Sequence, residues 1–398
     1  MSALPFALDS YTTEWLNLLA RWLHVIAGIA WIGSSFYFIA LDYKLLPPKD
    51  EADAAEGVGG EAWEVHGGGF YHVQKYRVAP PRLPERLLWF KWEAYTTWLS
   101  GFALYVVLYY LHADTYLVDR TVANLSTAAA VAISVGILAA GWLVYDGLCR
   151  ALGDRELLLA ACVLGFVTLV SWGSSELFSP RAAYLQVGAT IGTMMVGNVL
   201  FVIIPAHWEL IRAKEAGREP DPRWGVRGKV RSVHNNYLTL PVVFTMIANH
   251  FPAIYGHRRA WLVLVAIMAV SAWARHFFNL RHRGRNVWWI PVSAAAAIAL
   301  IAVLIRPQGG GSAGTVTPAQ LAAGKQVFRT AACAGCHTLA DADATGNIGP
   351  DLDAAKPSRA LVLDRVENGQ GAMPPFRGQL TQTQIEAVAD YVSTVAGK

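Results

Sequence analysis

The pentapeptide Cys333-Ala334-Gly335-Cys336-His337 decides the fold of the C-terminal part of the chain. Its C-x-x-C-H spacing is typical of c-type haem attachment, in which two sulfurs form thioethers with the haem and the histidine ligates the iron. A redox C-x-x-C or a zinc pair is the alternative. Residues 338–398 contain no further Cys or His, and no βαβ pattern surrounds the motif. We therefore expect covalent haem c, with Cys333 and Cys336 as its attachment points.

A second iron ligand is predicted downstream. In Gly371-Ala372-Met373-Pro374-Pro375, an isolated methionine lies between a glycine turn and two prolines. A thioether at this place is the natural sixth ligand, so His337 and Met373 are the expected axial pair. A Met/His pair raises the reduction potential toward that of an electron acceptor.

The composition indicates a membrane protein. Of the 398 residues, 54% are hydrophobic and only 16% are charged, whereas soluble proteins carry about 25% charged residues. Cys149 and Cys162 lie in apolar stretches and are expected to be packing residues, so no disulfide framework is predicted. No pattern typical of nucleic-acid or phosphate binding is found, and a nucleic-acid partner is not expected.

Apolar runs of about 20 residues, the length that crosses a bilayer, recur before residue 306. They cover 14–41, 94–112, 126–147, 157–175, 185–206, 236–255, 261–279 and 287–305. No Lys or Arg precedes the first run, so we interpret it as a retained span rather than a signal peptide. The expected fold is all-α, with an eight-helix transmembrane bundle over 1–306, a flexible linker over 307–315 and a small class I cytochrome c domain over 316–398.

Lys and Arg are distributed unevenly between the connections. Those after the odd-numbered runs hold nineteen, whereas the opposite side holds four before the C-terminal tail. The positive-inside rule therefore places the first set in the cytoplasm. The N-terminus and the cytochrome domain are then both periplasmic, in a bacterial inner membrane. This agrees with the outer face on which haem c is attached.

Histidines within or at the ends of the runs are candidate ligands of one or two haem b groups. A single intramembrane histidine is more often a hydrogen-bonded core residue, but histidines at matching depths on different helices can hold a cofactor. His24, one helical turn before Gly28, and His250 are predicted near the outer side, and His207 and His276 near the inner side. Haem b between the two faces would shorten electron transfer across a core about 30 Å thick.

The connection between the first two runs is the other candidate site. It contains His66, His72 and Lys75 around three glycines, and it leads into Lys91 and Glu93 at the second run. Its aromatic residues argue against disorder, although an amphipathic re-entrant segment is the alternative. The adjacent amides of Asn235 and Asn236 are expected at the same inner face.

Several of these segments resemble the bacterial membrane-bound urate hydroxylases, in which a urate-oxidising membrane domain is fused to a cytochrome c. The resemblance covers the whole chain and is carried by Arg21–Gly33, His66–Tyr76, Phe90–Trp98 and the C-terminal cytochrome. It implies oxidation of urate with water to 5-hydroxyisourate in purine degradation. Electrons would pass through haem to an external cytochrome c or a terminal oxidase, without hydrogen peroxide.

The resemblance also implies roles for the candidate residues. Urate is a flat, acidic purine, so its oxidation needs a base for the attacking water and cations near the anion. His72 or Glu93 is the expected base, and Lys75 or Lys91 the expected anion clamp. The catalytic candidates are His66, His72, Lys75, Lys91, Glu93, Asn235 and Asn236.

Two other functions compete with this interpretation. A quinol-oxidising membrane protein with a cytochrome tail would take a lipid-soluble substrate, whereas the polar, aromatic loop favours a polar one. A transporter with a redox-sensing tail would show repeat symmetry or broken half-helices, and only the run at 236–255 suggests such a break.

Overall fold

The computed structural model describes residues 10–120, 122–153, 155–257, 259–306, 316–347, 349–369 and 373–398. The predicted linker, 307–315, lies outside these residues. The chain divides into two compact units. The first lies within Met1–Val118, Val122–Asn249 and Arg259–Ala302, and the second within Asp119–Thr121, His250–Arg258 and Val303–Lys398.

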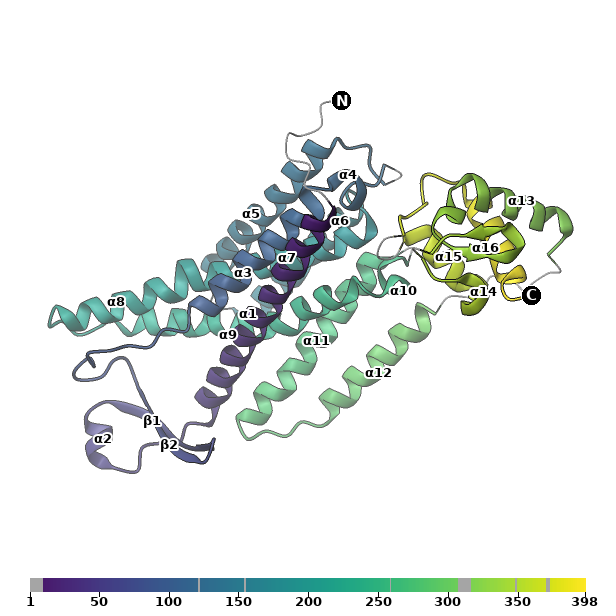
Figure 1. Cartoon of the computed structure of the whole chain (residues 1–398). Coiled ribbons are helices and arrows are strands. Elements are labelled where there is room, and N and C mark those ends of the chain that lie inside the picture. The colour runs from purple at the N-terminus through teal and green to yellow at the C-terminus, as the bar shows by residue number, and fades with distance from the viewer. Residues whose placement is uncertain are drawn as a thin grey trace. The chain divides into compact units, whose positions relative to one another are not determined.

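The first unit is a bundle of long helices (Figure 1). Its helices are α1 (Ser10–Lys44), α2 (Glu51–Ala55), α3 (Trp92–Tyr105), α4 (Ala113–Tyr116), α5 (Thr127–Leu152), α6 (Glu156–Ser175), α7 (Pro180–Asn198), α8 (Ile204–Glu215), α9 (Pro222–Ala248), α11 (Ala260–His282) and α12 (Trp289–Leu304). Helix α1 packs on α3, and α7 and α11 pack on α9. Many helices begin at side-chain caps, such as Ser126 before α5 and Asp221 before Pro222 of α9.

Five helical segments of the described chain are long and apolar enough to span a membrane. They are Trp15–Lys44, Thr127–Leu152, Glu156–Ser175, Pro180–Glu215 and Ala260–His282. The prediction of a helical membrane domain is thus supported, whereas the count of eight spans is not confirmed. Helix α12 is apolar but shorter.

Two predicted boundaries are wrong around the sixth run. Helix α8 continues to Glu215 and α9 already begins at Pro222, so most of the predicted connection at 207–235 is helical. Helix α9 ends at Ala248 rather than 255. Helix α9 begins well before the apolar run, because its polar first half also has side chains that are compatible with helical backbone hydrogen bonds.

Helices α7 and α8 form one segment with a π-helical turn, Val199–Ile203, between them. Pro205 follows this turn, and a proline has no N–H to donate to the preceding turn of helix. A π turn is a common way to accommodate such a break, and it often lies at functional sites. Here it directly follows the buried Asn198.

Glycines allow the central helices to approach closely. A Cβ at Gly188 of α7 would collide with Thr245 of α9, and one at Gly141 of α5 would collide with Thr190 of α7. Small residues at contact points are the usual device for packing helices in membranes, where burial of apolar surface adds little.

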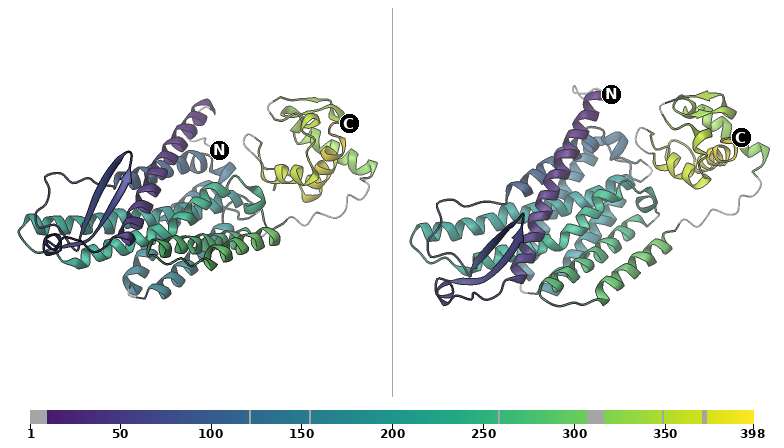
Figure 2. Two further views of the ribbon diagram at one scale, coloured as in Figure 1. Left: turned by 90° about the horizontal axis from the view of Figure 1, so that it is seen from below. Right: turned by 60° about the horizontal axis from the view of Figure 1, so that its bottom comes forward.

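A β-hairpin follows α1 and departs from the all-α prediction. Strand β1 (Val58–His66) pairs antiparallel with β2 (Gly69–Tyr76), and Gly67 and Gly68 form the turn with positive φ angles of 56° and 82°. The hairpin lies alongside the C-terminal half of α1 (Figure 2). The Tyr37 hydroxyl of α1 donates to Glu64 of β1, which fixes this position.

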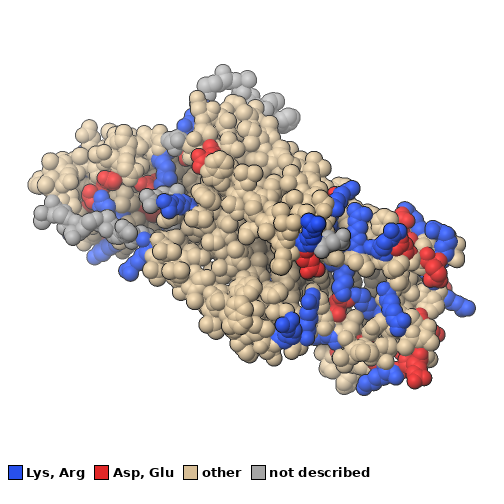
Figure 3. All heavy atoms as spheres, turned by 180° about the vertical axis from the view of Figure 1, so that it is seen from behind, with Lys and Arg blue, Asp and Glu red and all other residues tan. Residues whose placement is uncertain are grey.

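Charged side chains of the first unit gather at one end. On the face in Figure 3, Lys, Arg, Asp and Glu cluster over the hairpin and the α8–α9 connection, and a broad uncharged band covers the helices beyond them. Such a band is what lipid requires of the surface it contacts.

The second unit contains the C-terminal domain. Its elements are α10 (Pro252–Tyr255), α13 (Pro318–Thr330), β3 (Thr338–Leu339), β4 (Ala344–Thr345), α14 (Leu352–Ala355), α15 (Arg359–Asn368) and α16 (Gln382–Val395). Helices α13 and α16 cross tightly, since a Cβ at Gly324 would collide with Ala387, and Phe328 packs edge-on against Tyr391 with 6.1 Å between ring centroids. Capping boxes begin both helices.

Candidate functional site

The C-x-x-C-H motif folds as a compact loop after α13. Cys333–Gly335 forms one 3₁₀ turn, and the His337 amide donates to the Cys333 carbonyl at 3.0 Å. The His337 Nδ1–H donates to the Pro350 carbonyl at 2.8 Å, which fixes the tautomer and leaves Nε2 as the ligand atom. Burial raises the pKa of the Cys333 thiol to about 11. The residues present therefore fit a covalent haem c, whose iron exchanges one electron at a time.

Glycines shape this loop around the histidine. A Cβ at Gly349 would lie 2.5 Å from the His337 ring, and one at Gly346 would lie 2.6 Å from the Cys336 carbonyl carbon. Met373 packs against the core of α13, α15 and α16 in the same domain. Its assignment as the second axial ligand stays a prediction.

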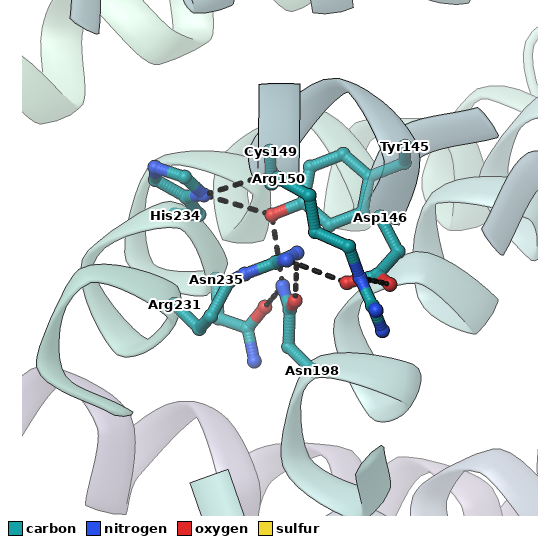
Figure 4. A network of polar contacts seen from close by, with 8 residues as sticks. All are labelled: Tyr145, Asp146, Cys149, Arg150, Asn198, Arg231, His234 and Asn235. Atoms are coloured by element: carbon teal, nitrogen blue, oxygen red, sulfur yellow. Dashed lines mark hydrogen bonds and ion pairs between the residues drawn. The ribbon is translucent and has the colours of Figure 1, made fainter. Parts of the chain in front are cut away.

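The first unit, called the membrane unit from here on, contains a buried polar network between α5, α7 and α9 (Figure 4). Arg231 is 4% exposed and pairs with Asp146 at 2.5 Å. It also donates to Asn198 at 3.0 Å. The Asn198 amide in turn donates to the Tyr145 hydroxyl at 3.0 Å and to Asn235 at 2.8 Å. The network therefore joins three helices through one buried ion pair.

His234 and Cys149 complete this network. The His234 Nδ1 lies 2.8 Å from the Tyr145 hydroxyl and 3.8 Å from the Cys149 sulfur. Asp146 also accepts from Arg150, whose side chain is 68% exposed. One carboxylate thus bridges a buried and an exposed arginine.

The two predicted amides face different neighbours. Asn235 belongs to the network just described, and its Nδ2 donates to the Met195 carbonyl. The Asn236 Oδ1 instead accepts from Arg275 of α11 at 2.9 Å. Consecutive residues on a helix are about 100° apart, so the two amides contact different neighbours, and the catalytic roles predicted for them stay predictions.

Arg275 is the centre of a second buried group. Its guanidinium lies over the Phe36 ring of α1 at 3.7 Å from the centroid, and its side chain is 4% exposed. Asn279, one turn further along α11, is also buried. Nearer the helix end, Arg283 lies over Tyr43 of α1 at 4.1 Å.

The hairpin carries three of the predicted catalytic residues in different settings. His66 lies exposed at the turn. His72 stacks on Trp63 with 4.3 Å between ring centroids, and its Nε2 lies 3.0 Å from Glu61. Lys75 points to the bundle, where its ammonium group pairs with the side chain of Asp42 on α1.

Asp42 connects the hairpin with the bundle. The carboxylate that holds Lys75 also pairs with Lys229 of α9 at 2.6 Å. Burial, with a smaller effect from Lys229, lowers the pKa of Lys75. Two ammonium groups thus share one carboxylate at the charged end of the unit, which leaves this end electropositive.

Lys91 and Glu93 lie at the start of α3. The Lys91 ammonium lies 4.8 Å from the Trp89 ring centroid and 6.0 Å from that of Trp208 on α8. The Glu93 Oε2 is buried and has no hydrogen-bond partner among the described residues. Lys91 is therefore held in an aromatic setting, whereas Glu93 keeps an acceptor available.

His24 of α1 packs against α3. Its Nδ1 lies 3.0 Å from the Thr97 carbonyl, and a Cβ at Gly101 would lie 2.7 Å from its Cε1. Nδ1 therefore carries the proton and Nε2 is the acceptor. This tautomer suits a ligand, but it equally suits a packed helix contact.

The other predicted haem b ligands are His207, His250 and His276. The His207 and Trp89 ring centroids are 6.3 Å apart, and the His276 Nδ1 lies 2.7 Å from the Tyr237 hydroxyl. His250 follows the end of α9 and belongs to the second unit. His207 and His276 contact aromatic side chains rather than one another, and the structure gives no support for haem b.

The sequence analysis did not identify Asp146, which belongs to the network around Arg231, or Arg275, the centre of the second buried group. Arg275 lies inside the apolar run 261–279 and Asp146 inside 126–147. The signal was present, because a charge within a predicted span is a functional or structural residue by default.

Comparisons with known proteins match two parts of the chain to two different families. Residues 10–306 match the family model described as urate oxidase N-terminal, and residues 319–392 match cytochrome c oxidase, cbb3-type, subunit III. The two matches therefore cover the membrane unit and the haem c domain in turn.

Relatives of the C-terminal part are small cytochromes. Cytochrome c6 of Leptolyngbya boryana is 38% identical over 84 residues, covering 20% of this chain and 98% of its own. Cytochrome c6 of Rippkaea orientalis is 44% identical over 82 residues, which cover 18% of this chain and 67% of the relative. The solved structure of the c-type cytochrome SorU from Sinorhizobium meliloti is 52% identical. The match covers 21% of this chain and 97% of SorU, with a TM-score of 0.20.

Proposed function

The chain belongs to the urate oxidase N-terminal family and ends in a cytochrome c domain, and from this we propose that it is a membrane-bound urate hydroxylase. The main support for this proposal is that the family match over 10–306 and a haem c site at His337 occur in one polypeptide. An oxidase with an attached electron acceptor does not need dioxygen as its oxidant.

The proposed reaction is urate plus water to 5-hydroxyisourate, two electrons and two protons. Water supplies the oxygen atom and loses a proton to a base as its oxygen bonds to C5 of the purine. The electrons leave singly through the cytochrome c domain to an external cytochrome c or a terminal oxidase. No hydrogen peroxide is formed, since oxygen is not reduced at this site.

Among the predicted bases, we favour Glu93 over His72. The buried Oε2 of Glu93 has no partner among the described residues, whereas His72 already contacts Glu61. A carboxylate with an open acceptor can take a proton from water if it lies within reach. Lys75 is favoured over Lys91 as a cation for the anion, because it lies at the electropositive end beside Lys229.

We further propose that the membrane unit spans a bacterial inner membrane eight times. Helices α3, α9 and α12 would add to the five segments that satisfy length and hydropathy. The charged end with the hairpin would face the cytoplasm by the positive-inside rule. An even number of spans puts the cytochrome domain in the periplasm. Urate would then be oxidised inside and its electrons delivered outside.

The test is anaerobic addition of urate to the purified, oxidised full chain. Reduction of the haem c absorption bands is expected, with 5-hydroxyisourate as product. In water labelled with ¹⁸O, the label should enter the product. Absence of haem reduction would overturn the proposal.

Quinol is the matched control substrate. A quinol-oxidising protein would reduce its haem faster with a ubiquinol analogue than with urate. That outcome would assign the membrane unit to the alternative function. A second control with dioxygen and a peroxide-sensitive dye should remain negative during urate turnover.

A further inference from the structure

Arg275 is a buried cation that has no acidic partner in the part of the chain that the structure describes. Its side chain is 4% exposed within α11. Its contacts are the Phe36 ring and the neutral Asn236 amide. An unpaired charge in such a place is unfavourable unless something compensates it. The other buried arginine of the bundle, Arg231, has its carboxylate in Asp146. The contrast indicates that the counterion of Arg275 comes from outside the protein.

The polar atoms around Arg275 are left without partners. The Arg275 Nη2 and the Asn236 Nδ2 have no hydrogen-bond acceptor among the described residues. Asn279 interacts with the Tyr237 hydroxyl of α9, but among the described residues neither its Oδ1 nor its Nδ2 has a partner in hydrogen-bond geometry. Asn236 is 0% and Asn279 2% exposed. Buried polar atoms are rarely left unsatisfied, so three donors and one acceptor are available to a ligand.

The surroundings favour a flat, aromatic ligand. Phe36 covers one side of the guanidinium, and the hydroxyl groups of Tyr237 and Tyr43 are close enough to interact with its charge. His276, the next residue of α11, stacks on Trp273. A planar anion with several carbonyl oxygens and a ring N–H would match the three donors and the acceptor, while its faces would meet aromatic carbon.

We propose that Arg275, Asn236 and Asn279 bind the purine anion, with Phe36 against the guanidinium. This inference rests on the proposed function and names the site at which its substrate is held. The roles are binding and orientation: the guanidinium neutralises the anion, and the two amides fix the edge of the ring. Such a site also explains why Asn236, and not Asn235, faces α11.

The position of Arg275 indicates the route of entry. It lies seven residues before His282, where α11 ends, which corresponds to about 10 Å along the helix. Arg283 lies over Tyr43 just beyond that end. Lys75 and Lys229 are at the same charged end of the unit. An anion arriving from this side meets exposed cations first and the buried arginine last.

The test measures binding separately from oxidation. The haem of the full-length protein is first reduced with ascorbate under argon, so that bound urate has no electron acceptor. Equilibrium dialysis with ¹⁴C-urate then gives Kd for the wild type and for Arg275→Met, Arg275→Lys, Asn236→Asp and Arg212→Met. Arg212 is an exposed arginine of α8 paired with Glu209, and it controls for loss of positive charge at this end.

Arg275→Met should weaken binding by about 10- to 100-fold, the effect expected for a lost charge-assisted hydrogen bond. Arg275→Lys should have a smaller effect because it keeps the charge. Asn236→Asp should also weaken urate binding by at least about tenfold, because the new carboxylate is an internal counterion for Arg275. Arg212→Met should bind as the wild type does.

Thermal unfolding in detergent separates binding from a structural role. Without urate, Asn236→Asp should melt no lower than the wild type. Urate should raise the melting temperature of the wild type and of Arg212→Met, but not that of Asn236→Asp. Wild-type affinity in Arg275→Met, or equal losses in Arg212→Met, would overturn the site while leaving the proposed function intact. A wild type that neither binds urate nor reduces its haem with it would overturn both.

Discussion

Asp146 offers the sharpest test of how the membrane unit is stabilised, because it pairs with two arginines in opposite environments. Arg231 is 4% exposed and Arg150 is largely in solvent. Asp146→Asn keeps the shape of the side chain but removes the counterion of a buried guanidinium. Breaking a buried pair in this way destabilises a protein by about 3–5 kcal/mol, a change of about a hundredfold or more in the folding equilibrium.

The exposed partner supplies the matched control. Arg150→Met removes a pair on the same carboxylate, and exposed pairs contribute about 0–1 kcal/mol. The free energy of unfolding can be measured by titrating mixed micelles with SDS and following far-ultraviolet circular dichroism. In the double variant Asp146→Leu with Arg231→Met, most of the loss should be recovered, since no charge remains buried.

The reasoning is wrong if Asp146→Asn and Arg150→Met have equal effects within about 0.5 kcal/mol, the usual error of additivity. It is also wrong if the double variant is no more stable than Asp146→Asn. The haem c bands should be unchanged throughout, because the network lies in the other unit.

The remaining predictions concern the cytochrome domain and the cofactors. Met373→His should lower the haem c midpoint potential by on the order of 0.1 V, within the roughly 0.8 V range that axial ligands set, and redox titration measures it. Asp341 accepts from the Tyr391 hydroxyl, which with Lys325 lowers the pKa of this carboxyl. Its stabilisation is therefore complete above the ordinary Asp pKa, near 4, and is lost as pH falls through the lowered value. Asp341→Asn should destabilise the domain at pH 7, and the difference from the wild type should shrink as the pH falls below about 4, which thermal unfolding over a pH series can test. A pyridine haemochrome assay tests haem b: a b-type signal absent from His24→Ala would confirm the ligand, and haem c alone would exclude it.

The C-terminal domain was predictable because its chemistry is local. Five consecutive residues specify the haem attachment, and the family match over 319–392 agrees with the domain they predicted. The Nδ1 contact of His337 with Pro350 could not be predicted, since it depends on how the loop returns to the ring. That return needs Gly349, whose role is visible only in three dimensions.

The membrane unit was predictable as a class but not in detail. Hydropathy located apolar runs, yet it was silent about α9, whose first half is polar and still helical. The hairpin was missed because the glycines were interpreted as part of a ligand-binding loop, although two adjacent glycines between alternating side chains also indicate a β-turn, and both have positive φ angles in the structure.

The candidate site was the least predictable part. Asn235 and Asn236 were expected together at the inner face, and only the helix rotation shows that they contact different groups. Arg275 was overlooked because its run is otherwise apolar. Partners on α1, α9 and α11 are far apart in sequence, and without an observed fold nothing brings Phe36, Asn236 and Arg275 together.

Asn235 and Asn236 are attached to neighbouring Cα atoms, which a peptide bond holds 3.8 Å apart. Helix α9 cannot turn or slide at this point without moving both amides at once. Any ligand that pulls on Asn236 therefore also strains the amide that Asn198 holds, and with it the ion pair behind Asn198. A displacement of Asn236 on one side of α9 is therefore expected to move the contacts of Asn235 on the other side of the same helix.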